Sequence, residues 1–408
     1  MQLKEFSLIS PVVETGTVLK ALETAIPTVA IEQAITDTHS KEERKRALPS
    51  HLVVCLVIAM SLWSKDSIRA VLKNLVDGLS ETWVKIGQYR RVPCKSSITE
   101  ARQRIGSQVM SRLFHLVVRP LATEKTPGAF LGGLRIMAVD GTVFDVPDTK
   151  ENARVFGYPA SRPGTRAAFP KVRLVLLIEA GTHLIVDALI CPYRIGERVK
   201  VKKLLRSVTQ GMLLMWDRGL HSYQMVQASL AQKCDYLGRV PKNVKFPAEK
   251  LLEDGSYLSW IAPDGKSKKK GAREIRVRVI EYTIDTHGES QIYRLITSLT
   301  DIVQFPALVL ATEYHRRWEV ENTIDELKVH LWGRKTPIRS LNPREVVQEV
   351  YGWLIGHWAI RSLMFQVADG AQMSPLRLSF TGTLNVVRRA VPKFQRLQPK
   401  EIPFFSLG

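Results

Sequence analysis

The alternation of apolar strands and helices over residues 134–240 constrains the fold more than any other feature of this sequence. LRIMAVD predicts a strand that ends in an acid, and KVRLVLLIEAG and THLIVDALIC predict two more strands, separated by the hairpin signal Gly181-Thr182. Residues 198–208 and 222–232 have helical patterns; MLLMWD forms a short apolar strand between them and DYLGRV follows as another strand. The order β-β-β-α-β-α-β predicts a mixed α/β sheet whose first three strands form a meander.

The segments that follow or flank this sheet have different patterns. SHLVVCLVIAMSLW predicts a buried helix, DSIRAVLKNLVDG predicts a second, and the capping box Ser97-Ile-Thr-Glu100 predicts the start of a third. Residues 241–300 alternate as strands do, which predicts a β-rich insertion. From Pro306 one long helix is predicted to about Trp332, and VVQEVYGWLIGHWAIRSLMF predicts another.

Composition narrows the class of protein and its partners. A chain of 408 residues favours two or three domains. The formal charge of +20 favours a nucleic acid or an anionic surface as a partner, although a cationic shell that only keeps the protein in solution is the alternative. The four cysteines are far apart and form no CxxC pair, so neither a zinc module nor a disulfide framework is expected, and a reducing bacterial cytoplasm fits. The start lacks a signal-peptide pattern and the longest apolar run is too short to span a bilayer, so no membrane role is expected.

The segment YHRRWEVENTIDELKVHL carries the strongest sign of chemistry. At about 100° per residue, Tyr314, Arg317, Glu321 and Lys328 fall within a stripe of about 60° on one helix face. The apolar residues lie on the next stripe, so the helix is expected to pack on a core and to present a carboxylate flanked by cations. Asp325 is the local rival of Glu321. A set of ordinary surface ion pairs is the alternative interpretation.

Two further acids follow predicted strands. Asp140 comes at the end of LRIMAVD and Asp217 at the end of MLLMWD, and each is followed by residues that also fit a simple turn. Carboxylates at such strand ends can meet at the open edge of a sheet, where α/β folds place their sites. Two acids at short range repel each other unless a cation lies between them, and oxygen ligands of this kind suit Mg²⁺ or Mn²⁺.

In this order the motifs resemble those of the insertion sequence 4 family of DDE transposases. The Y-x2-R-x3-E-x6-K spacing of the glutamate segment matches that family's signature, and DGTVFDVPDT and WDRGLHS are similar to its first and second acidic motifs. The likeness runs from about residue 45 to 366 and includes the β-rich insertion. It implies a ribonuclease H-like core that performs cut-and-paste DNA transposition, usually as a homodimer on its DNA.

The resemblance also assigns residues. It implies that Asp140, Asp217 and Glu321 are the catalytic acids and hold Mg²⁺, with Mn²⁺ as a substitute. It further implies that Arg317 and Lys328 contact phosphates near the cut, with Tyr314 supporting the same face. The expected partner is double-stranded DNA, both the terminal inverted repeats of the element and the target.

Two basic groups are further candidates for DNA contact. The β-rich insertion holds a dense set of cations, which we interpret as a surface that follows the phosphates, with a solvated loop as the alternative. Its members are Lys266, Lys268, Lys269, Lys270, Arg273, Arg276 and Arg278. Arg102 and Arg104 follow the capping box and fit a helix-turn-helix-like reader, although a small helical bundle with a basic face fits them as well.

The predicted fold is therefore an α/β ribonuclease H-like mixed sheet with a β-rich insertion and helical regions at both ends of the chain. The expected parts are a helical DNA-binding region at 1–125, the first part of the core at 126–240, the insertion at 241–302, the core helix with the third acid at 303–335, and a helical region at 336–408. A structure-selective nuclease on the same core, and a DNA-binding protein without catalysis, are the alternatives to a transposase.

Overall fold

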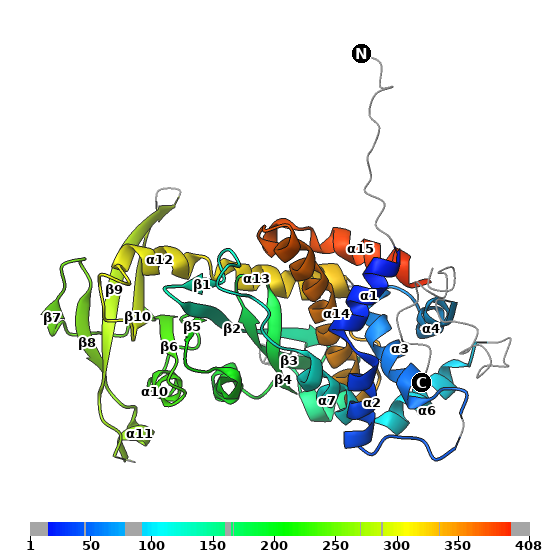
Figure 1. Cartoon of the computed structure of the whole chain (residues 1–408). Coiled ribbons are helices and arrows are strands. Elements are labelled where there is room, and N and C mark those ends of the chain that lie inside the picture. The colour runs from blue at the N-terminus through cyan, green and yellow to red at the C-terminus, as the bar shows by residue number, and fades with distance from the viewer. Residues whose placement is uncertain are drawn as a thin grey trace.

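The computed structural model describes residues 15–44, 46–77, 92–159, 165, 167–269, 271–286, 289–333 and 335–392. Its long axis runs from a β-rich end to a helical end, with the mixed sheet between them (Figure 1). The strands are β1 (Phe130–Leu131), β2 (Leu134–Asp145), β3 (Lys171–Glu179), β4 (Leu184–Pro192), β5 (Met212–Trp216), β6 (Asp235–Arg239), β7 (Lys250–Leu251), β8 (Tyr257–Ile261), β9 (Ile275–Thr286) and β10 (Glu289–Thr297).

The helices lie mainly at the two ends of the chain. The α-helices are α1 (Thr15–Ala25), α2 (Thr28–Asp37), α3 (Ser50–Leu62), α4 (Ile68–Asp77), α6 (Lys95–Ile105), α7 (Gln108–Val117), α8 (Lys150–Phe156), α9 (Glu197–Leu204), α10 (Tyr223–Ala231), α11 (Gly265–Lys269), α12 (Ala307–His315), α13 (Trp318–Asp325), α14 (Pro343–Gly370) and α15 (Phe380–Ala390). Two short 3₁₀ turns, η2 (Leu205–Ser207) and η4 (Pro375–Arg377), and one π-helical segment, η3 (Glu326–Trp332), complete the set for the described residues.

The centre of the sheet has the predicted topology. Strands β2, β3 and β4 form an antiparallel meander, and β5 and β6 continue the sheet beside β2 in parallel. Strand β3 is buried along nearly its whole length, because the sheet is covered on both faces and each face needs apolar side chains. The mixed sheet predicted from residues 134–240 is confirmed.

The β-rich insertion joins the same sheet. Strand β10 pairs antiparallel with β6, and β9, β8 and β7 follow it outward, which gives the order β4-β3-β2-β5-β6-β10-β9-β8-β7. The insertion is therefore an extension of the central sheet that lengthens one end of the molecule (Figure 1).

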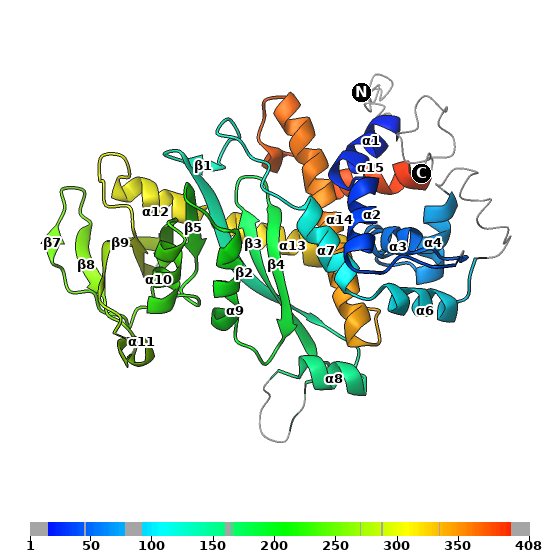
Figure 2. The same cartoon turned by 60° about the horizontal axis from the view of Figure 1, so that its bottom comes forward.

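Helices cover both faces of the central strands. In Figure 2, α9 and α10 lie in front of the sheet, while α12 and α13 lie behind it. Side chains from helices on both faces can therefore approach the place where the pairing of β2 with β5 ends.

The first and last helical regions form one body. Helix α14 contacts α1, α3, α7 and α15, and most of its residues are buried. The predicted helices at 50–63 and 346–365 are confirmed by α3 and α14. The predicted capping box is wrong: α6 begins at Lys95, two residues before Ser97, with Cys94 at its N-cap. No helix among the described residues is long and apolar enough to cross a membrane.

Candidate active site

Asp140 on β2 and Asp217, directly after the neighbouring strand β5, occupy matching positions. Strands β2 and β5 pair in parallel up to Ala138 and Met215, and two residues further along each strand this register reaches Asp140 and Asp217. Asp217 directly follows β5, as predicted. Asp140 does not end its strand, which corrects the prediction: β2 runs on to Asp145 because it stays paired with β3. What ends near Asp140 is the pairing with β5, and this opens one edge of β2.

The predicted long helix is broken into three pieces. Helix α12 ends at His315, and a tight turn follows in which the Arg317 N–H donates to the Tyr314 carbonyl at 3.1 Å. Helix α13 then carries Glu321, and the backbone continues as the π-helix η3 until Gly333 adopts a left-handed conformation with φ 57°. The single helix predicted to Trp332 is therefore wrong. The predicted apolar stripe is nevertheless largely buried: Val320, Leu327 and Leu331 are at 0% exposure, and Ile324 is partly buried.

Arg317 connects the acids. Its Nη2 lies 3.2 Å from Oε1 of Glu321, and its Nη1 lies 3.9 Å from Oδ2 of Asp140. The guanidinium carbon also lies 5.8 Å from the ring centre of Tyr314, which is buried. The structure thus brings Tyr314, Arg317, Glu321 and Asp140 together around one cation.

The charges of this cluster act on one another. Burial raises the pKa of Asp140, and the negative charges of Asp217 and Glu321 raise it further, against the opposing effects of the Gly141 N–H and Arg317. Burial raises the pKa of Tyr314 to about 12, so its hydroxyl stays neutral at physiological pH. The repulsion among the carboxylates means that an added cation would stabilise the cluster.

The donor set suits a divalent cation in its chemistry. Asp140, Asp217 and Glu321 offer only carboxylate oxygens, the ligands that Mg²⁺ and Mn²⁺ prefer. Within the described part of the chain, no three His, Cys, Asp or Glu side chains are already gathered closely enough to hold a metal ion. Arg317 explains part of this spacing, because its guanidinium lies between Asp140 and Glu321.

A network of buried side chains holds the segment that carries Glu321. Glu319 accepts a hydrogen bond from Nε2 of His183 at 2.9 Å, the unprotonated Nδ1 of the same ring accepts one from Arg361 at 2.7 Å, and Glu326 accepts hydrogen bonds from His357 and Arg361. Burial lowers the pKa of His183 to about 4, so its ring is neutral near pH 7. These contacts engage Glu319 and Glu326 in the network, and they tie α13 and η3 to the turn before β4 and to α14.

Lys328 extends from η3 toward the same strand as Asp140. Its Nζ lies 5.7 Å from the ring centre of Phe144, which is four residues beyond Asp140 on β2. Residues 140 and 144 share a face of the strand because side chains alternate. Lys328 is thus on the face of the sheet where Arg317 contacts Asp140.

Glu197 is a fourth acid at this place, and sequence reasoning missed it. It is the first residue of α9, and its carboxylate lies against Gly141. Burial, followed by the negative charge of Asp140, raises the pKa of Glu197 to about 7, while Arg173 opposes the shift. The segment IGERVK has the pattern of an ordinary helix start. The one indication in the sequence is Gly141, which follows Asp140 and, having no side chain, allows a neighbour to approach closely.

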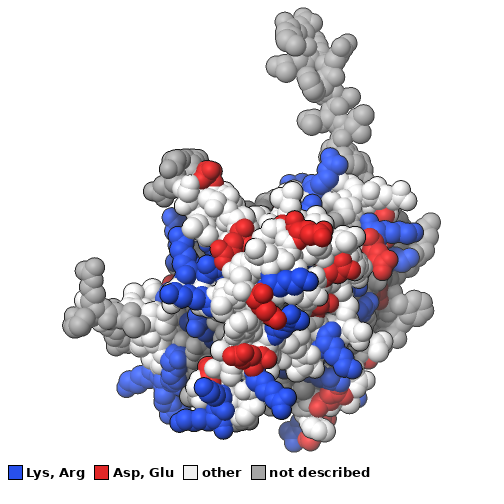
Figure 3. Space-filling model, turned by 90° about the vertical axis from the view of Figure 1, so that its left-hand side faces the viewer, with Lys and Arg blue, Asp and Glu red and all other residues white. Residues whose placement is uncertain are grey.

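The basic cluster of the insertion is partly on the surface. Lys268, Lys269 and Arg273 are exposed, and Arg276 pairs with Glu249 at 2.8 Å. Figure 3 looks onto this end of the molecule, and Lys and Arg side chains gather along its lower edge, where α11 lies in Figure 1. Lys270 lies outside the described residues.

Arg278 does not belong to that surface, which corrects the prediction. Its guanidinium is buried, donates to the carbonyls of Leu299 and Phe305, and pairs with Asp254. Residue 278 lies in the middle of β9, where residues 277–280 are buried on both faces, whereas Arg276 on the same face of the strand is exposed.

Arg102 is also buried, whereas Arg104 is partly exposed. Arg102 donates to Ser340 at 2.9 Å and to the Glu345 carbonyl at 3.0 Å, so the predicted DNA contact is wrong for this residue. Its cationic end is used to join α6 to α14. Arg104 donates to the Leu48 carbonyl at 2.6 Å and keeps part of its side chain in solvent.

Comparison with known proteins gives matches along most of the chain. Residues 17–115 match the family model for the insertion element 4 transposase N-terminal region, and residues 131–355 match the one for the transposase DDE domain. The chain is 26% identical over 379 residues to the transposase InsG for insertion sequence element IS4 of Escherichia coli (strain K12), which covers 91% of this chain and 83% of that protein. It is 25% identical over 256 residues to the putative transposase InsZ of the same organism, with 61% and 80% covered.

A solved structure shares the fold. The cryo-EM structure of the piggyBac transposase synaptic complex with hairpin DNA matches with a TM-score of 0.50 at 12% identity, covering 93% of this chain and 81% of that one. This likeness confirms the predicted ribonuclease H-like class. The DDE-domain match spans more than half of the chain. The chain therefore belongs to the insertion sequence 4 family of DDE transposases, which cleave DNA with divalent metal ions.

Proposed function

We propose that Asp140, Asp217 and Glu321 are the catalytic acids of this transposase and that they hold Mg²⁺, for which Mn²⁺ can substitute. The observation that carries the proposal is the contact of Arg317 with both Asp140 and Glu321, while Asp217 follows the strand that pairs with β2 two residues before Asp140 and its charge acts on Asp140. When bound, the metal would lower the pKa of the attacking oxygen and stabilise the leaving oxygen.

The cations beside the acids have a complementary role. Arg317 and Lys328 would each bind a phosphate oxygen next to the scissile bond, which orients the phosphorus for in-line attack and offsets its growing negative charge. Tyr314 would hold Arg317 in place through the cation–π contact of its ring with the guanidinium. Arg317 would then exchange its carboxylate partners for a phosphate when DNA arrives.

The reaction would be cut-and-paste transposition in two kinds of step. In the first, water attacks a phosphorus at the end of the element and the bond to the 3′ oxygen breaks. In the second, the freed 3′-hydroxyl attacks a phosphorus of the target and the bond to a second 3′ oxygen breaks. Both are displacements at phosphorus, so the same acids and cations serve each.

Its DNA partners would be the double-stranded terminal repeats of the element and the target duplex. Lys268, Lys269, Lys270 and Arg273 would follow the phosphates, and Arg104 is a further candidate on the helical body. We also propose a homodimer in the DNA complex, since an element has two ends, and the bacterial cytoplasm at the nucleoid as the place of action. The chain would divide into five parts at 1–125, 126–240, 241–302, 303–335 and 336–408.

The test is a cleavage and strand-transfer assay on a duplex that carries the ends of the element. Asp140→Asn, Asp217→Asn and Glu321→Gln should each abolish both Mg²⁺-dependent steps and leave DNA binding in place. The matched control is Asp325→Asn, because Asp325 is an exposed acid on the same helix as Glu321. Full activity in the three variants, or its loss in the control alone, would overturn the assignment of the acids.

A further inference from the structure

Glu197 reaches the candidate active site from the face of the sheet opposite to α13. Helix α9 begins at this residue, with Gly196 as its N-cap in extended conformation. The carboxylate lies over the backbone of Gly141, and a Cβ placed on Gly141 would be 2.6 Å from each of its oxygens. No real Cβ tolerates such a distance, so the absence of a side chain at 141 is what admits Glu197.

The edge of β2 is open at this position. Pairing between β2 and β5 ends at Ala138, three residues before Gly141. The Asp140 Oδ1 atom accepts a hydrogen bond from the Gly141 N–H at 2.7 Å, so the Asp140 carboxylate turns toward the residue against which Glu197 lies. The charges of Asp140 and Asp217 both act on Glu197.

Arg173 is the cation that faces Glu197, and it is a weak partner. The distance from its Nη1 to Oε2 of Glu197 is 3.5 Å, and the guanidinium also stacks on the Tyr193 ring at 4.9 Å. Arg173 beside Glu197 and Arg317 between Asp140 and Glu321 are two cations for four carboxylates, because Asp217 belongs to the same group, so a surplus of negative charge remains. Carboxylates at such range are stable together when a further cation joins them.

We propose that Glu197 is a fourth carboxylate of the metal centre, held at the Gly141 gap so that it supplies an oxygen ligand beside Asp140. This inference rests on the proposed function, because it takes Asp140 and Asp217 as metal ligands. Gly141 supports the arrangement because it keeps the passage between α9 and the edge of β2 free. Arg173 orients the Glu197 carboxylate from the other side.

The experiment measures Mn²⁺ binding rather than catalysis. Mn²⁺ is titrated into the full-length chain without DNA, and free Mn²⁺ is followed by its electron paramagnetic resonance signal. Glu197→Gln keeps the size of the side chain and its contact with Arg173 but removes the charge. It should raise the Mn²⁺ dissociation constant by about 10-fold or more. Glu124→Gln, at an exposed turn, removes the same charge elsewhere and should change nothing.

A second variant tests the same gap without touching the acid. Gly141→Ala places a methyl group where the Glu197 oxygens lie and should weaken Mn²⁺ binding to a similar degree. The double variant Gly141→Ala/Glu197→Gln should be no weaker than either single one, because both remove the same ligand. Additive losses would mean that the two residues act independently and would contradict the proposal.

The outcomes separate this inference from the proposed function. If Asp140→Asn abolishes Mn²⁺ binding while Glu197→Gln binds as tightly as the wild type, Glu197 is only a partner of Arg173 and the inference is wrong, although the proposed function stands. If neither Asp140→Asn nor Asp217→Asn weakens Mn²⁺ binding, the proposed metal centre fails and this inference fails with it.

Discussion

The Nη1 nitrogen of Arg317 lies 3.9 Å from the Oδ2 oxygen of Asp140, and the Arg317 side chain is only 12% exposed. The same guanidinium pairs with Glu321. A fixed positive charge therefore stands where two of the proposed metal ligands would have to meet. Without DNA it offsets their repulsion, and it also competes with a metal ion for their oxygens.

The first prediction follows from this competition. Arg317→Gln should tighten Mn²⁺ binding in the absence of DNA, by roughly tenfold if the ion pairs it removes are worth about 1.4 kcal/mol. The same variant should lose most of its DNA cleavage, because a phosphate contact is missing. Titration of the DNA-free chain with Mn²⁺ and a cleavage assay give the two readouts.

Arg316→Gln is the matched control for that variant. Arg316 is the preceding residue, is 58% exposed and pairs with Glu313 rather than with the acids of the site. It should change neither readout. Weaker Mn²⁺ binding in Arg317→Gln would show that the guanidinium organises the acids instead of competing for them.

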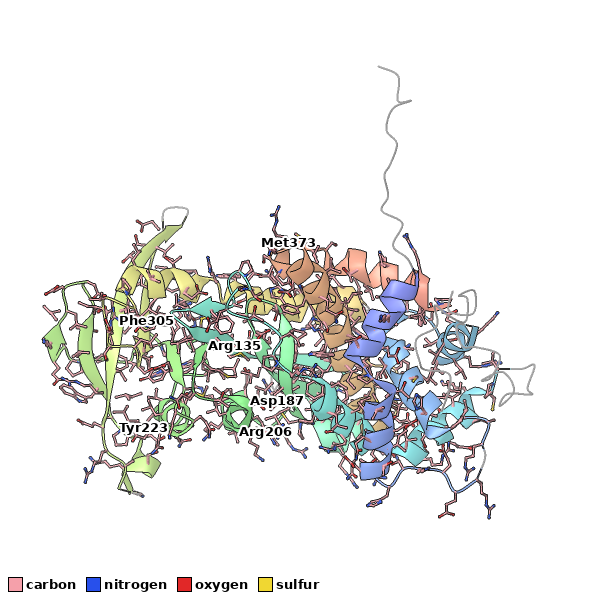
Figure 4. The ribbon with its side chains drawn as sticks, viewed as in Figure 1. Arg135, Asp187, Arg206, Tyr223, Phe305 and Met373 are labelled. Atoms are coloured by element: carbon pink, nitrogen blue, oxygen red, sulfur yellow. The ribbon has the colours of Figure 1, made fainter. Side chains whose placement is uncertain are left out.

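A pH-dependent contribution to stability is expected from Asp187, which lies beside Arg206 where β4 meets η2 (Figure 4). Burial by itself would raise the pKa of Asp187, but hydrogen bonds from His115, Arg206 and Ser207 together lower it to about 2. A carboxyl group with a pKa below its unfolded value stabilises the fold above that value, and the stabilisation disappears as the pH falls toward 2. Asp187→Asn should therefore cost roughly 2 kcal/mol of unfolding free energy at pH 7.

Urea unfolding at pH 7 and pH 3 measures this cost. The difference between Asp187→Asn and the wild type should shrink at the lower pH, because pH 3 lies below the ordinary pKa of 3.8 and the unfolded chain then binds a proton that the folded chain does not. Asp369→Asn, at an exposed position near the end of α14, serves as the control and should have no effect at either pH. An equal cost at both pH values would mean that Asp187 acts through packing rather than charge.

How far the site could be predicted depends on whether its signal is local. Asp217 follows a short apolar strand, and Tyr314, Arg317 and Glu321 lie within eight residues of one another, so their pattern is visible in the sequence. Asp140 was predicted as a site residue because it was expected to end its strand. In the structure β2 continues past Asp140, and what ends near it is the pairing of β2 with β5.

The remaining misses come from contacts between distant parts of the chain. Nothing near Glu197 indicates that it meets Gly141, 56 residues earlier in the chain. A helical wheel at 100° per residue also cannot foresee the turn at Arg317 or the π-helix after Asp325. The helical periodicity around Arg102 likewise does not indicate that Ser340 and the start of α14 supply its hydrogen-bond partners.

Replacing Arg102 is expected to lower the stability of the protein without changing how it binds DNA. Its guanidinium lies 3.7 Å from the Glu345 carboxylate, and both side chains are buried. Removing one member of a buried pair leaves the other uncompensated, so Arg102→Ala should lower the free energy of unfolding by about 3 kcal/mol. At a temperature where the variant is folded, the salt dependence of its DNA binding should match that of the wild type. A shallower salt dependence would mean that Arg102 does reach a phosphate.

The basic surface of the insertion is expected to give the opposite pattern. Lys268→Gln, Lys269→Gln and Arg273→Gln, combined in one chain, should reduce the slope of log binding constant against log salt by about one for each phosphate that is no longer bound. Stability should hardly change, because the three side chains are exposed. Lys125→Gln, at an exposed turn outside the insertion, is the control. An unchanged slope in the triple variant would exclude this surface as a phosphate-binding one.

The union of the two helical regions into one body depends on a close approach of α14 to α3. A Cβ placed on Gly352 would lie 2.5 Å from the Val57 carbonyl oxygen and 3.0 Å from its Cγ1 atom. Gly352→Ala must therefore push the helices apart, which costs about 1–3 kcal/mol and outweighs the roughly 1 kcal/mol that alanine adds to helix stability. Gly370→Ala is the matched control at the end of the same helix, because a Cβ there meets nothing within 4 Å. Urea unfolding should show a loss for the first variant and none for the second; an equal response of both would mean that the two regions are not packed at Gly352.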